Sequence, residues 1–181
     1  MIKTLIGFIL GLLVVPVVGA AVLISGHFPF QATEKPPRWE GRIAGLALDP
    51  AVERKAEGLA NPITATDADL MRGMKLYRDD CSGCHGEPGK PSRWGRYNLY
   101  PPAPQLADRG DRDPVPEIFV VVKYGIRYTG MGGWKDQVPE DDLWRVALFL
   151  SRVKSLPPAV ESAWKSPAQG APATRRQGPS R

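Results

Sequence analysis

The stretch Cys81-Ser82-Gly83-Cys84-His85 combines the side chains in this chain best suited to chemistry. Two thiols separated by two residues, with an imidazole directly after the second, have the spacing that attaches a c-type haem. Each thiol can form a thioether with one haem vinyl group, and the short spacer lets both reach the same porphyrin edge. The imidazole then lies beneath the iron as its proximal ligand. We therefore predict one covalently bound haem c, attached through Cys81 and Cys84.

Other uses of a Cys-x-x-Cys pair fit the sequence less well. A zinc site normally needs a second pair of ligands, and the chain has only two cysteines and two histidines. A redox dithiol of the thioredoxin type would follow a strand, whereas the residues before Cys81 have helical periodicity. A disulfide that closes so short a loop would add little stability. Haem attachment is the interpretation that uses both thiols and the imidazole.

The second axial ligand of the iron has few candidates. Met1 is the first residue of the chain, and His27 lies beside the N-terminal apolar segment. Met71 and Met74 lie in the predicted helix before the cysteines. Met131 lies instead in a loop whose neighbouring glycines let the backbone approach a porphyrin. We predict that His85 and Met131 hold the iron. The alternative is that Met131 is buried near an open haem, which would indicate a ligand binder or a peroxidase.

The first predicted helix leads directly to the haem motif. It begins near Thr66, whose hydroxyl can cap the free backbone amides while Asp69 reciprocates three residues later. Apolar side chains follow at helical spacing, with Gly73 among them. A glycine inside a helix costs about 1 kcal/mol relative to alanine, and the usual compensation is the close approach of another helix.

Two more helices and a long loop are predicted after the motif. Residues 86–114 lack periodicity and form the predicted loop, which would wrap a haem edge. Residues 118–122 have β propensity, but Pro114 and Gly125 flank them as a helix start and stop, which favours a helix. A last helix starts at Pro139, with acidic side chains in its first turn, basic ones near its end and one apolar stripe.

The N-terminus predicts a membrane anchor over residues 1–26. Residues 5–24 contain no charged side chain and are long enough to cross a bilayer as a helix. A cleaved secretory signal is the alternative, because Lys3 supplies a positive start and small residues follow at positions 19–21. Because haem is attached covalently on the outer side of bacterial membranes, we expect the main domain to face the periplasm from the inner membrane, although a positive-inside count alone favours the cytoplasm.

The remainder of the chain divides into three predicted parts. Residues 27–60 are rich in proline and are predicted to be a periplasmic linker, with a packed accessory segment as an equal alternative. Residues 61–158 contain the predicted haem domain, and residues 159–181 the predicted disordered tail. Residues 61–156 contain 14 Lys and Arg against 13 Asp and Glu, so the sequence gives no support for a nucleic-acid partner.

The order of these motifs resembles the class I c-type cytochromes, especially the small membrane-anchored monohaem forms of bacterial respiratory chains. The stretches 73–86 (GMKLYRDDCSGCHG), 123–134 (KYGIRYTGMGGW) and 143–158 are similar to the first helix, the methionine loop and the closing helix of that family. The resemblance implies an all-α fold packed around one haem. Gly132 stands where the family often has a proline after the ligand methionine.

The resemblance also implies specific contacts around the haem. Residues 104–106 look like the family's Pro-x-Leu segment, which implies that the Pro104 carbonyl accepts a hydrogen bond from His85 and that Leu106 packs on the porphyrin. It further implies that Gly73 and Tyr77 of the first helix meet the last helix near Trp144 and Leu148.

Together, these features predict a one-electron carrier and not an enzyme. A thioether ligand favours ferrous iron, and two protein ligands on the iron block oxygen chemistry. The expected partners are a redox protein donor and a redox protein acceptor, both associated with the membrane, in a respiratory or related chain. Two alternatives stay open: a haem enzyme or gas sensor with an open distal site, and a haem subunit of a larger oxidoreductase complex.

Overall fold

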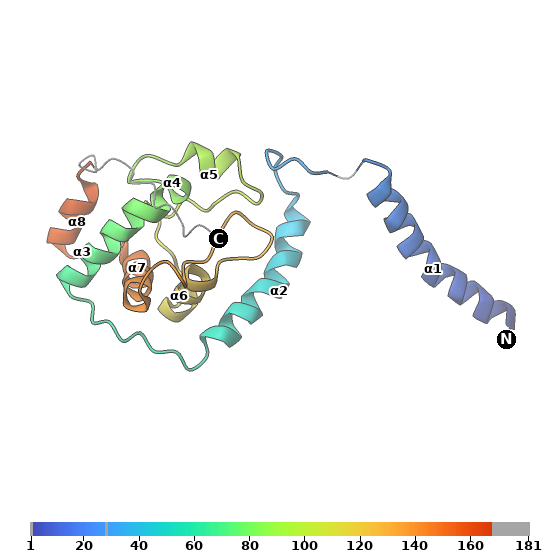
Figure 1. Ribbon diagram of the computed structural model, residues 1–181, viewed down its shortest axis with the longest axis horizontal. Helices are drawn as coiled ribbons and strands as arrows, with labels where there is room; N and C mark the ends of the chain where they lie inside the picture. Colours follow the sequence, from blue (N-terminus) through green and yellow to red (C-terminus); the bar gives the residue numbers. More distant parts are fainter. Residues whose placement is uncertain (1, 28, 168–181) are drawn as a thin grey trace. The chain divides into compact units, whose positions relative to one another are not determined.

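The structure is a computed structural model that describes residues 2–27 and 29–167 (Figure 1). The chain divides into two compact units, Met1–Gln31 and Ala32–Arg181, of which the first contains α1 (Ile2–Ile24). The described part of the second unit contains no strand, as the all-α prediction requires. Its helices are α2 (Arg38–Ala56), α3 (Asp67–Leu76), the π-helical η1 (Tyr77–Cys81), α4 (Ser82–His85), α5 (Arg93–Tyr97), α6 (Val115–Tyr124), α7 (Glu140–Arg152) and α8 (Pro158–Lys165).

The predicted anchor, residues 1–26, falls on α1, a 23-residue helix with Pro16 inside it. Among the residues that the structure describes, no helix meets the combined requirement of length and apolarity for a membrane span. The anchor therefore stays a prediction from the sequence.

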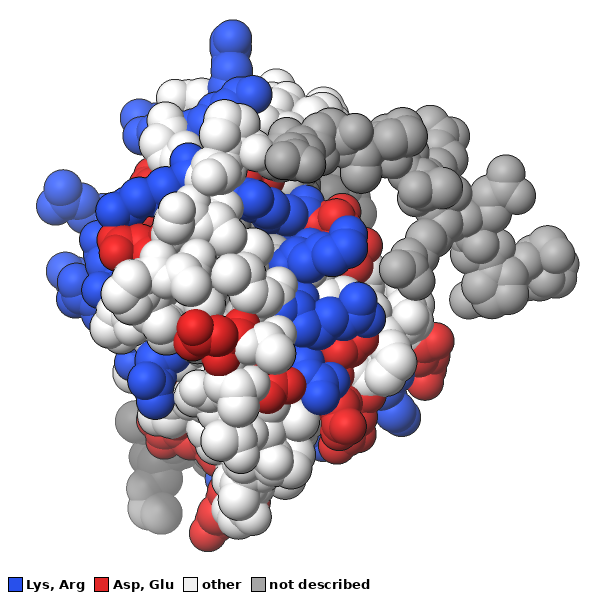
Figure 2. All heavy atoms as spheres, turned by 90° about the vertical axis from the view of Figure 1, so that its left-hand side faces the viewer, with Lys and Arg blue, Asp and Glu red and all other residues white. Residues whose placement is uncertain are grey.

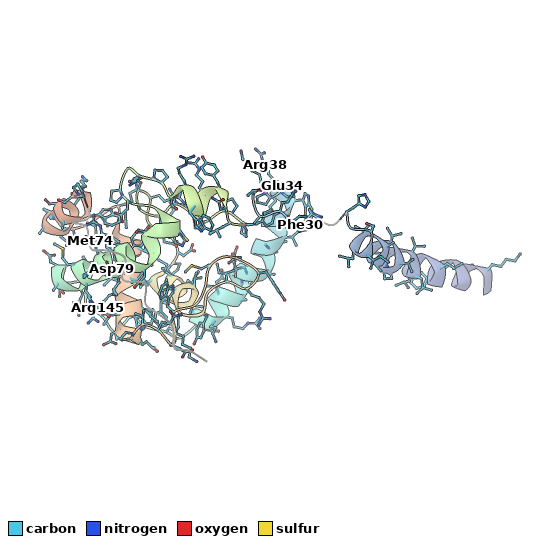
Figure 3. All side chains as sticks on the ribbon, turned by 45° about the horizontal axis from the view of Figure 1, so that its top comes forward. Phe30, Glu34, Arg38, Met74, Asp79 and Arg145 are labelled. Carbon is cyan, nitrogen blue, oxygen red and sulfur yellow. The ribbon has the colours of Figure 1, made fainter. Side chains whose placement is uncertain are left out.

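Helices α3 and α7 cross at Gly73, where their backbones come into contact. A Cβ atom on Gly73 would lie 2.2 Å from the carbonyl oxygen of Arg145 and 3.0 Å from the Cβ of Phe149. Figure 3 labels Arg145 on α7, beside α3. One turn further along the chain, the ring of Tyr77 packs on Phe149 with centroids 5.9 Å apart. The predicted close approach at Gly73 is therefore present.

The contact on α7 lies near Trp144 and Leu148, as the resemblance implied, but its partners are the next residues along the helix. Gly73 and Tyr77 meet Arg145 and Phe149, each one residue after the expected Trp144 and Leu148. Successive residues on a helix are rotated by about 100°. Trp144 and Leu148 therefore lie on other faces of α7. Trp144 stacks on Phe119 of α6, with ring centroids 3.7 Å apart, and Leu148 packs with Leu70 and Val160.

The packed part of the second unit is longer than the predicted domain, residues 61–158. At one end, α2 lies within the predicted linker, residues 27–60, and packs against α6 with Ala56 buried in the core. This arrangement matches the accessory-segment alternative.

At the other end, α8 occupies the start of the predicted tail, residues 159–181. Its Trp164 is buried against Tyr77 and Phe149, which explains why this segment is ordered. Residues 168–181 of that tail lie outside the described residues.

Surface charge is mixed on the face of the molecule that carries α8 and α3. Figure 2 shows Lys and Arg side chains interspersed with Asp and Glu there. Some of them form pairs along one helix, such as Lys165 with Glu161 at 2.6 Å and Lys75 with Asp79 at 2.8 Å. Such a surface differs from the continuous basic stripe that binds nucleic-acid backbones.

Asp142 links α7 to α3 through an ion pair with Arg72, in which the carboxylate is buried and the guanidinium is half exposed. Its carboxylate accepts hydrogen bonds from Arg72 at 2.6 Å and from Arg145 at 3.1 Å, and only 8% of its side chain is exposed. The hydrogen bond from Arg72 is the main cause that lowers the pKa of Asp142. A carboxyl group with a lowered folded-state pKa stabilises the fold above its unfolded-state pKa, about 3.9, and this contribution is lost as pH falls through the folded-state pKa.

We expect Asp142→Asn to lower the free energy of unfolding at pH 7 by about 2 kcal/mol, because the variant loses the negative charge that strengthens three hydrogen bonds from Arg72 and Arg145. The difference from the wild type should shrink as the pH falls below about 4, where the wild-type carboxyl becomes protonated. Denaturant unfolding at several pH values measures both effects. Asp141→Asn, a change at the exposed neighbour, is the control and should have little effect. A constant Asp142→Asn difference down to pH 3 would contradict this account.

Candidate haem site

Helices η1 and α4 present the Cys-x-x-Cys-His stretch. In η1 the chain winds more widely than in α3, and the Ser82 amide donates to the carbonyl of Tyr77, five residues earlier. This π turn rotates the following side chains relative to the axis of α3, and such turns are frequent at functional sites. Gly86, with φ of 86°, then ends α4 in a conformation that favours glycine. Both cysteines are present as free thiols.

Buried hydrogen bonds hold the backbone of α4 from two sides. The Tyr77 hydroxyl lies 3.0 Å from the carbonyl oxygens of both His85 and Gly86 and donates its proton to this pair. The Gln105 amide donates to the carbonyl of Cys84 at 3.1 Å. Burial raises the pKa of Tyr77, so its hydroxyl stays a donor over the physiological range. These contacts leave the turn that carries Cys84 and His85 little freedom to move.

Helix α5 supports the same turn and was missed by the sequence analysis. Ser92 caps it by accepting from the Gly95 amide at 3.0 Å, and its hydroxyl donates to the Gly83 carbonyl at 2.5 Å. A Cβ atom on Gly95 would lie 2.0 Å from the Cys84 carbonyl oxygen, so the backbones touch. A five-residue helix has no clear periodicity, and Ser92 is the only local signal that could have indicated it.

His85 is buried and oriented by its own hydrogen bond. Its Nδ1 lies 2.7 Å from the Pro104 carbonyl oxygen, which can only accept, so Nδ1 carries the proton. The other ring nitrogen, Nε2, is left with a free lone pair, which is what a metal requires. Burial lowers the pKa of His85, which favours the neutral ring. The Leu106 amide donates to the His85 carbonyl at 3.0 Å and fixes the Pro-x-Leu segment alongside.

Met131 lies in a loop that is tied together by its own backbone. Its amide donates to the Thr129 hydroxyl at 3.0 Å, and its carbonyl accepts from the Ile126 amide at 3.0 Å. At Gly125, with φ of 68°, a Cβ atom would lie 2.6 Å from the Met131 carbonyl oxygen. A Cβ atom on the following Gly132 would meet nothing within 4 Å. The loop is thus held at both ends even without a proline after Met131.

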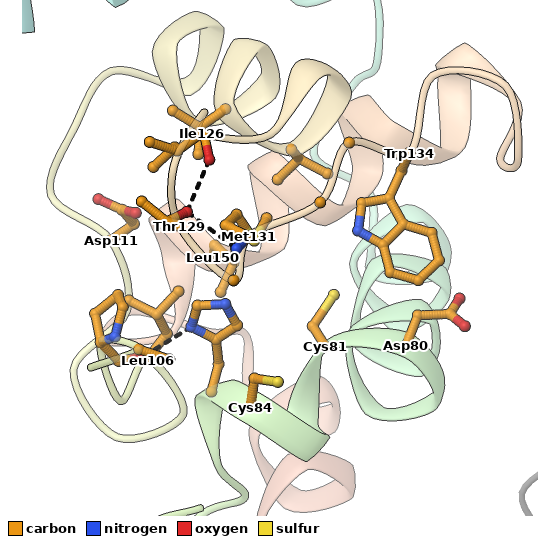
Figure 4. A pocket seen from close by; sticks show the side chains of 18 of the residues that line it. Asp80, Cys81, Cys84, Leu106, Asp111, Ile126, Thr129, Met131, Trp134 and Leu150 are labelled. Carbon is orange, nitrogen blue, oxygen red and sulfur yellow. Dashed lines mark hydrogen bonds between the residues drawn. The ribbon is translucent and has the colours of Figure 1, made fainter. Parts of the chain in front are cut away.

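One cavity of about 290 Å³ is lined by Cys81, Cys84, His85 and Met131 (Figure 4). Cys81 and Cys84 lie on one side of it and Met131 on the opposite wall (Figure 4). The cavity brings together all six predicted cofactor-binding residues: Cys81, Cys84, His85, Pro104, Leu106 and Met131. The long loop lines it as predicted, but Trp94 and Tyr97 of α5 are exposed and do not take part. Sequence reasoning did not single out several other lining residues: Leu99, Pro101, Val121, Ile126, Trp134 and Leu150.

Residues 68–150, which include both cysteines, His85 and Met131, match the family model described as cytochrome c oxidase, cbb3-type, subunit III. Residues 68–150 form a class I c-type cytochrome domain. The search of curated proteins found no match for the chain. A cytochrome domain of this class binds haem c covalently and serves as a haem electron carrier.

The donor set of the cytochrome domain fits haem c. Two thiols, an imidazole with a free Nε2 and a thioether all border one largely apolar cavity. Burial raises the pKa of the free Cys81 thiol to about 12, so before attachment this cysteine is neutral in its apolar surroundings. Among the described residues, no cluster of acidic, cysteine and histidine side chains could hold a bare metal ion instead.

Proposed function

We propose that the cytochrome domain carries single electrons on an iron held by His85 and Met131, with the porphyrin attached to Cys81 and Cys84. The observation that carries this proposal is the placement of the imidazole and the thioether on one cavity together with both thiols. When bound, the haem supplies the redox-active iron. The chain supplies a neutral imidazole, which Pro104 orients through Nδ1, and a soft sulfur ligand that favours the ferrous state.

Water exclusion is the second contribution of the chain. Apolar residues form most of the cavity wall, and Leu106 in particular is buried beside the proposed proximal ligand. An apolar surround stabilises the less charged ferrous form of the haem, as does the thioether. With His85 and Met131 both bound, the iron would have no open position at which oxygen or peroxide could bind. The same groups therefore favour electron transfer over catalysis.

The proposed setting is the periplasmic face of a bacterial inner membrane. Its support is the sequence of residues 1–26, which predicts an anchor, together with the outer-side location of haem attachment. Such a tethered domain would receive and pass on electrons through transient contacts with membrane-associated redox proteins.

A second candidate is a haem subunit of a larger oxidoreductase complex. The matched family description, subunit III of a cbb3-type oxidase, favours it. Extraction in mild detergent followed by native sizing distinguishes the two candidates. A free carrier migrates near the mass of one chain, whereas a subunit migrates with its partners.

We expect the purified holoprotein to titrate as one reversible one-electron centre. Because the proposed Met131 bond occupies the last axial position, carbon monoxide should fail to bind stoichiometrically to the reduced protein at pH 7. Visible spectroscopy during a potentiometric titration, with and without carbon monoxide, measures both properties. Stoichiometric carbon monoxide binding, or turnover of hydrogen peroxide, would instead favour the haem enzyme or sensor.

A further inference from the structure

Helix α2 lies outside the matched segment 68–150, yet it contacts the haem domain at both of its ends. Near its C-terminal end, Ala56 is buried in the core and the Lys55 ammonium lies 4.4 Å from the ring centroid of Tyr124, the last residue of α6. Near its N-terminal end, Glu40 contacts the loop that follows α5. The helix therefore bridges two segments that border the cavity.

The N-terminal contact is a hydrogen bond across sixty residues of sequence. The Tyr100 hydroxyl donates to the Glu40 carboxylate at 2.5 Å, and both residues are half-buried. This bond is the main cause that raises the pKa of Tyr100 to about 12. A short bond to a carboxylate is charge-assisted and stronger than a neutral one. It holds the backbone at Tyr100 to α2.

The residue before Tyr100 touches the methionine loop. Leu99 lines the cavity, and its Cδ2 would lie only 2.8 Å from a Cβ atom on Gly130. Gly130 directly precedes Met131, so the Leu99 side chain lies against the backbone that carries the proposed distal ligand. A shift of this backbone toward Leu99 would therefore have to displace the Leu99 side chain.

We propose that Glu40 is a positioning residue for the distal face of the haem, acting through Tyr100 and Leu99 on the loop that carries Met131. This proposal rests on the proposed ligation by Met131. The hydrogen bond holds the backbone next to Leu99, and the Leu99 side chain in turn limits the space open to the loop that carries Met131. An accessory helix outside the matched domain thereby contributes to how firmly the iron keeps its thioether.

Imidazole binding to the oxidised holoprotein tests the proposal, because imidazole must displace Met131 to reach the iron. Glu40→Ala and Tyr100→Phe should each raise the imidazole affinity about fivefold, the size expected for one charge-assisted hydrogen bond that is partly exposed. The double variant should show little further gain, because both changes remove the same bond. Glu40→Gln keeps an acceptor oxygen but loses the negative charge, so its imidazole affinity should lie between that of the wild type and that of Glu40→Ala.

Glu34→Ala is the matched control. Glu34 lies near the start of α2 (Figure 3) and its charge acts on Tyr100, but the single hydroxyl proton is donated to Glu40. This variant should leave imidazole affinity unchanged. A general loss of structure would instead lower the denaturation midpoint of every variant, so this midpoint is measured alongside.

Two outcomes overturn the proposal in distinguishable ways. If Met131→Leu greatly raises imidazole affinity while Glu40→Ala and Tyr100→Phe do not, Met131 is the ligand and Glu40 has no positioning role. If Met131→Leu itself leaves the affinity unchanged, the ligation by Met131 is wrong, and the role of Glu40 fails with it.

Discussion

Gly73→Ala should lower the free energy of unfolding by about 3 kcal/mol, even though alanine is the better helix former by about 1 kcal/mol. The added methyl group would lie 2.2 Å from the Arg145 carbonyl oxygen and 2.7 Å from its carbonyl carbon. These are backbone atoms in the middle of α7, so no side-chain rotation can relieve the overlap. The helices must separate, which loosens the packing of Phe149 behind them. Denaturant unfolding of the holoprotein, followed by circular dichroism, measures the loss.

Gly41→Ala is the matched control for this prediction. It makes the same change inside α2, where a Cβ atom would meet nothing within 4 Å. Its expected effect is a small gain in stability, up to about 1 kcal/mol, from helix propensity alone. Equal and small effects at Gly73 and Gly41 would contradict the close crossing of α3 and α7.

Met131→Leu should lower the reduction potential on the order of 100 mV or more, because axial ligands set haem potentials over a range of roughly 0.8 V. Leucine keeps most of the apolar volume but has no sulfur to stabilise ferrous iron. The weak methionine-to-iron charge-transfer band of the oxidised protein should disappear in the same variant. Potentiometric titration and visible spectroscopy measure the two effects.

Met74→Leu is the control for the distal ligand. Met74 is a buried thioether of α3 that belongs to the core and does not line the cavity. A volume-conserving change there should cost less than about 1.5 kcal/mol and leave both the band and the potential in place. An unchanged band in Met131→Leu would show that another group, or none, occupies the distal position.

Local signals predicted the helices that carry the site. Thr66 caps α3 as expected, accepting from the Asp69 amide and donating to the Asp69 carboxylate. Residues 118–122 are helical despite their β propensity, because Pro114 and Gly125 bound the segment and its apolar side chains face the core. Cys81, Cys84 and His85 were predicted for a different reason, since the Cys-x-x-Cys-His spacing identifies its chemistry without knowledge of the fold. Met131 was chosen because glycines flank it, whereas Pro104 and Leu106 came from the resemblance.

The elements that were missed are short and depend on tertiary contacts. Helix α8 has eight residues and begins at the second of two prolines, Pro158. Its order comes from Trp164, which packs on Tyr77 and Phe149 far away in sequence. Arg78 adds a hydrogen bond of 2.6 Å to the Trp164 carbonyl. The contact of α3 with α7 was predicted only to within one residue, because so wide an apolar stripe on α7 does not specify which of its residues meets Gly73.

The enclosure of Tyr77 also sets an order of events during synthesis. Its ring lies against Phe149 and Trp164, with centroids 5.9 and 5.6 Å away, and its hydroxyl fastens the turn at His85. In a chain made from its N-terminus, residues 81–85 are made before Phe149 and Trp164. During that interval both thiols are accessible on an open chain. Tyr77 can be enclosed, and the turn at His85 fixed, only after α7 and α8 have been made.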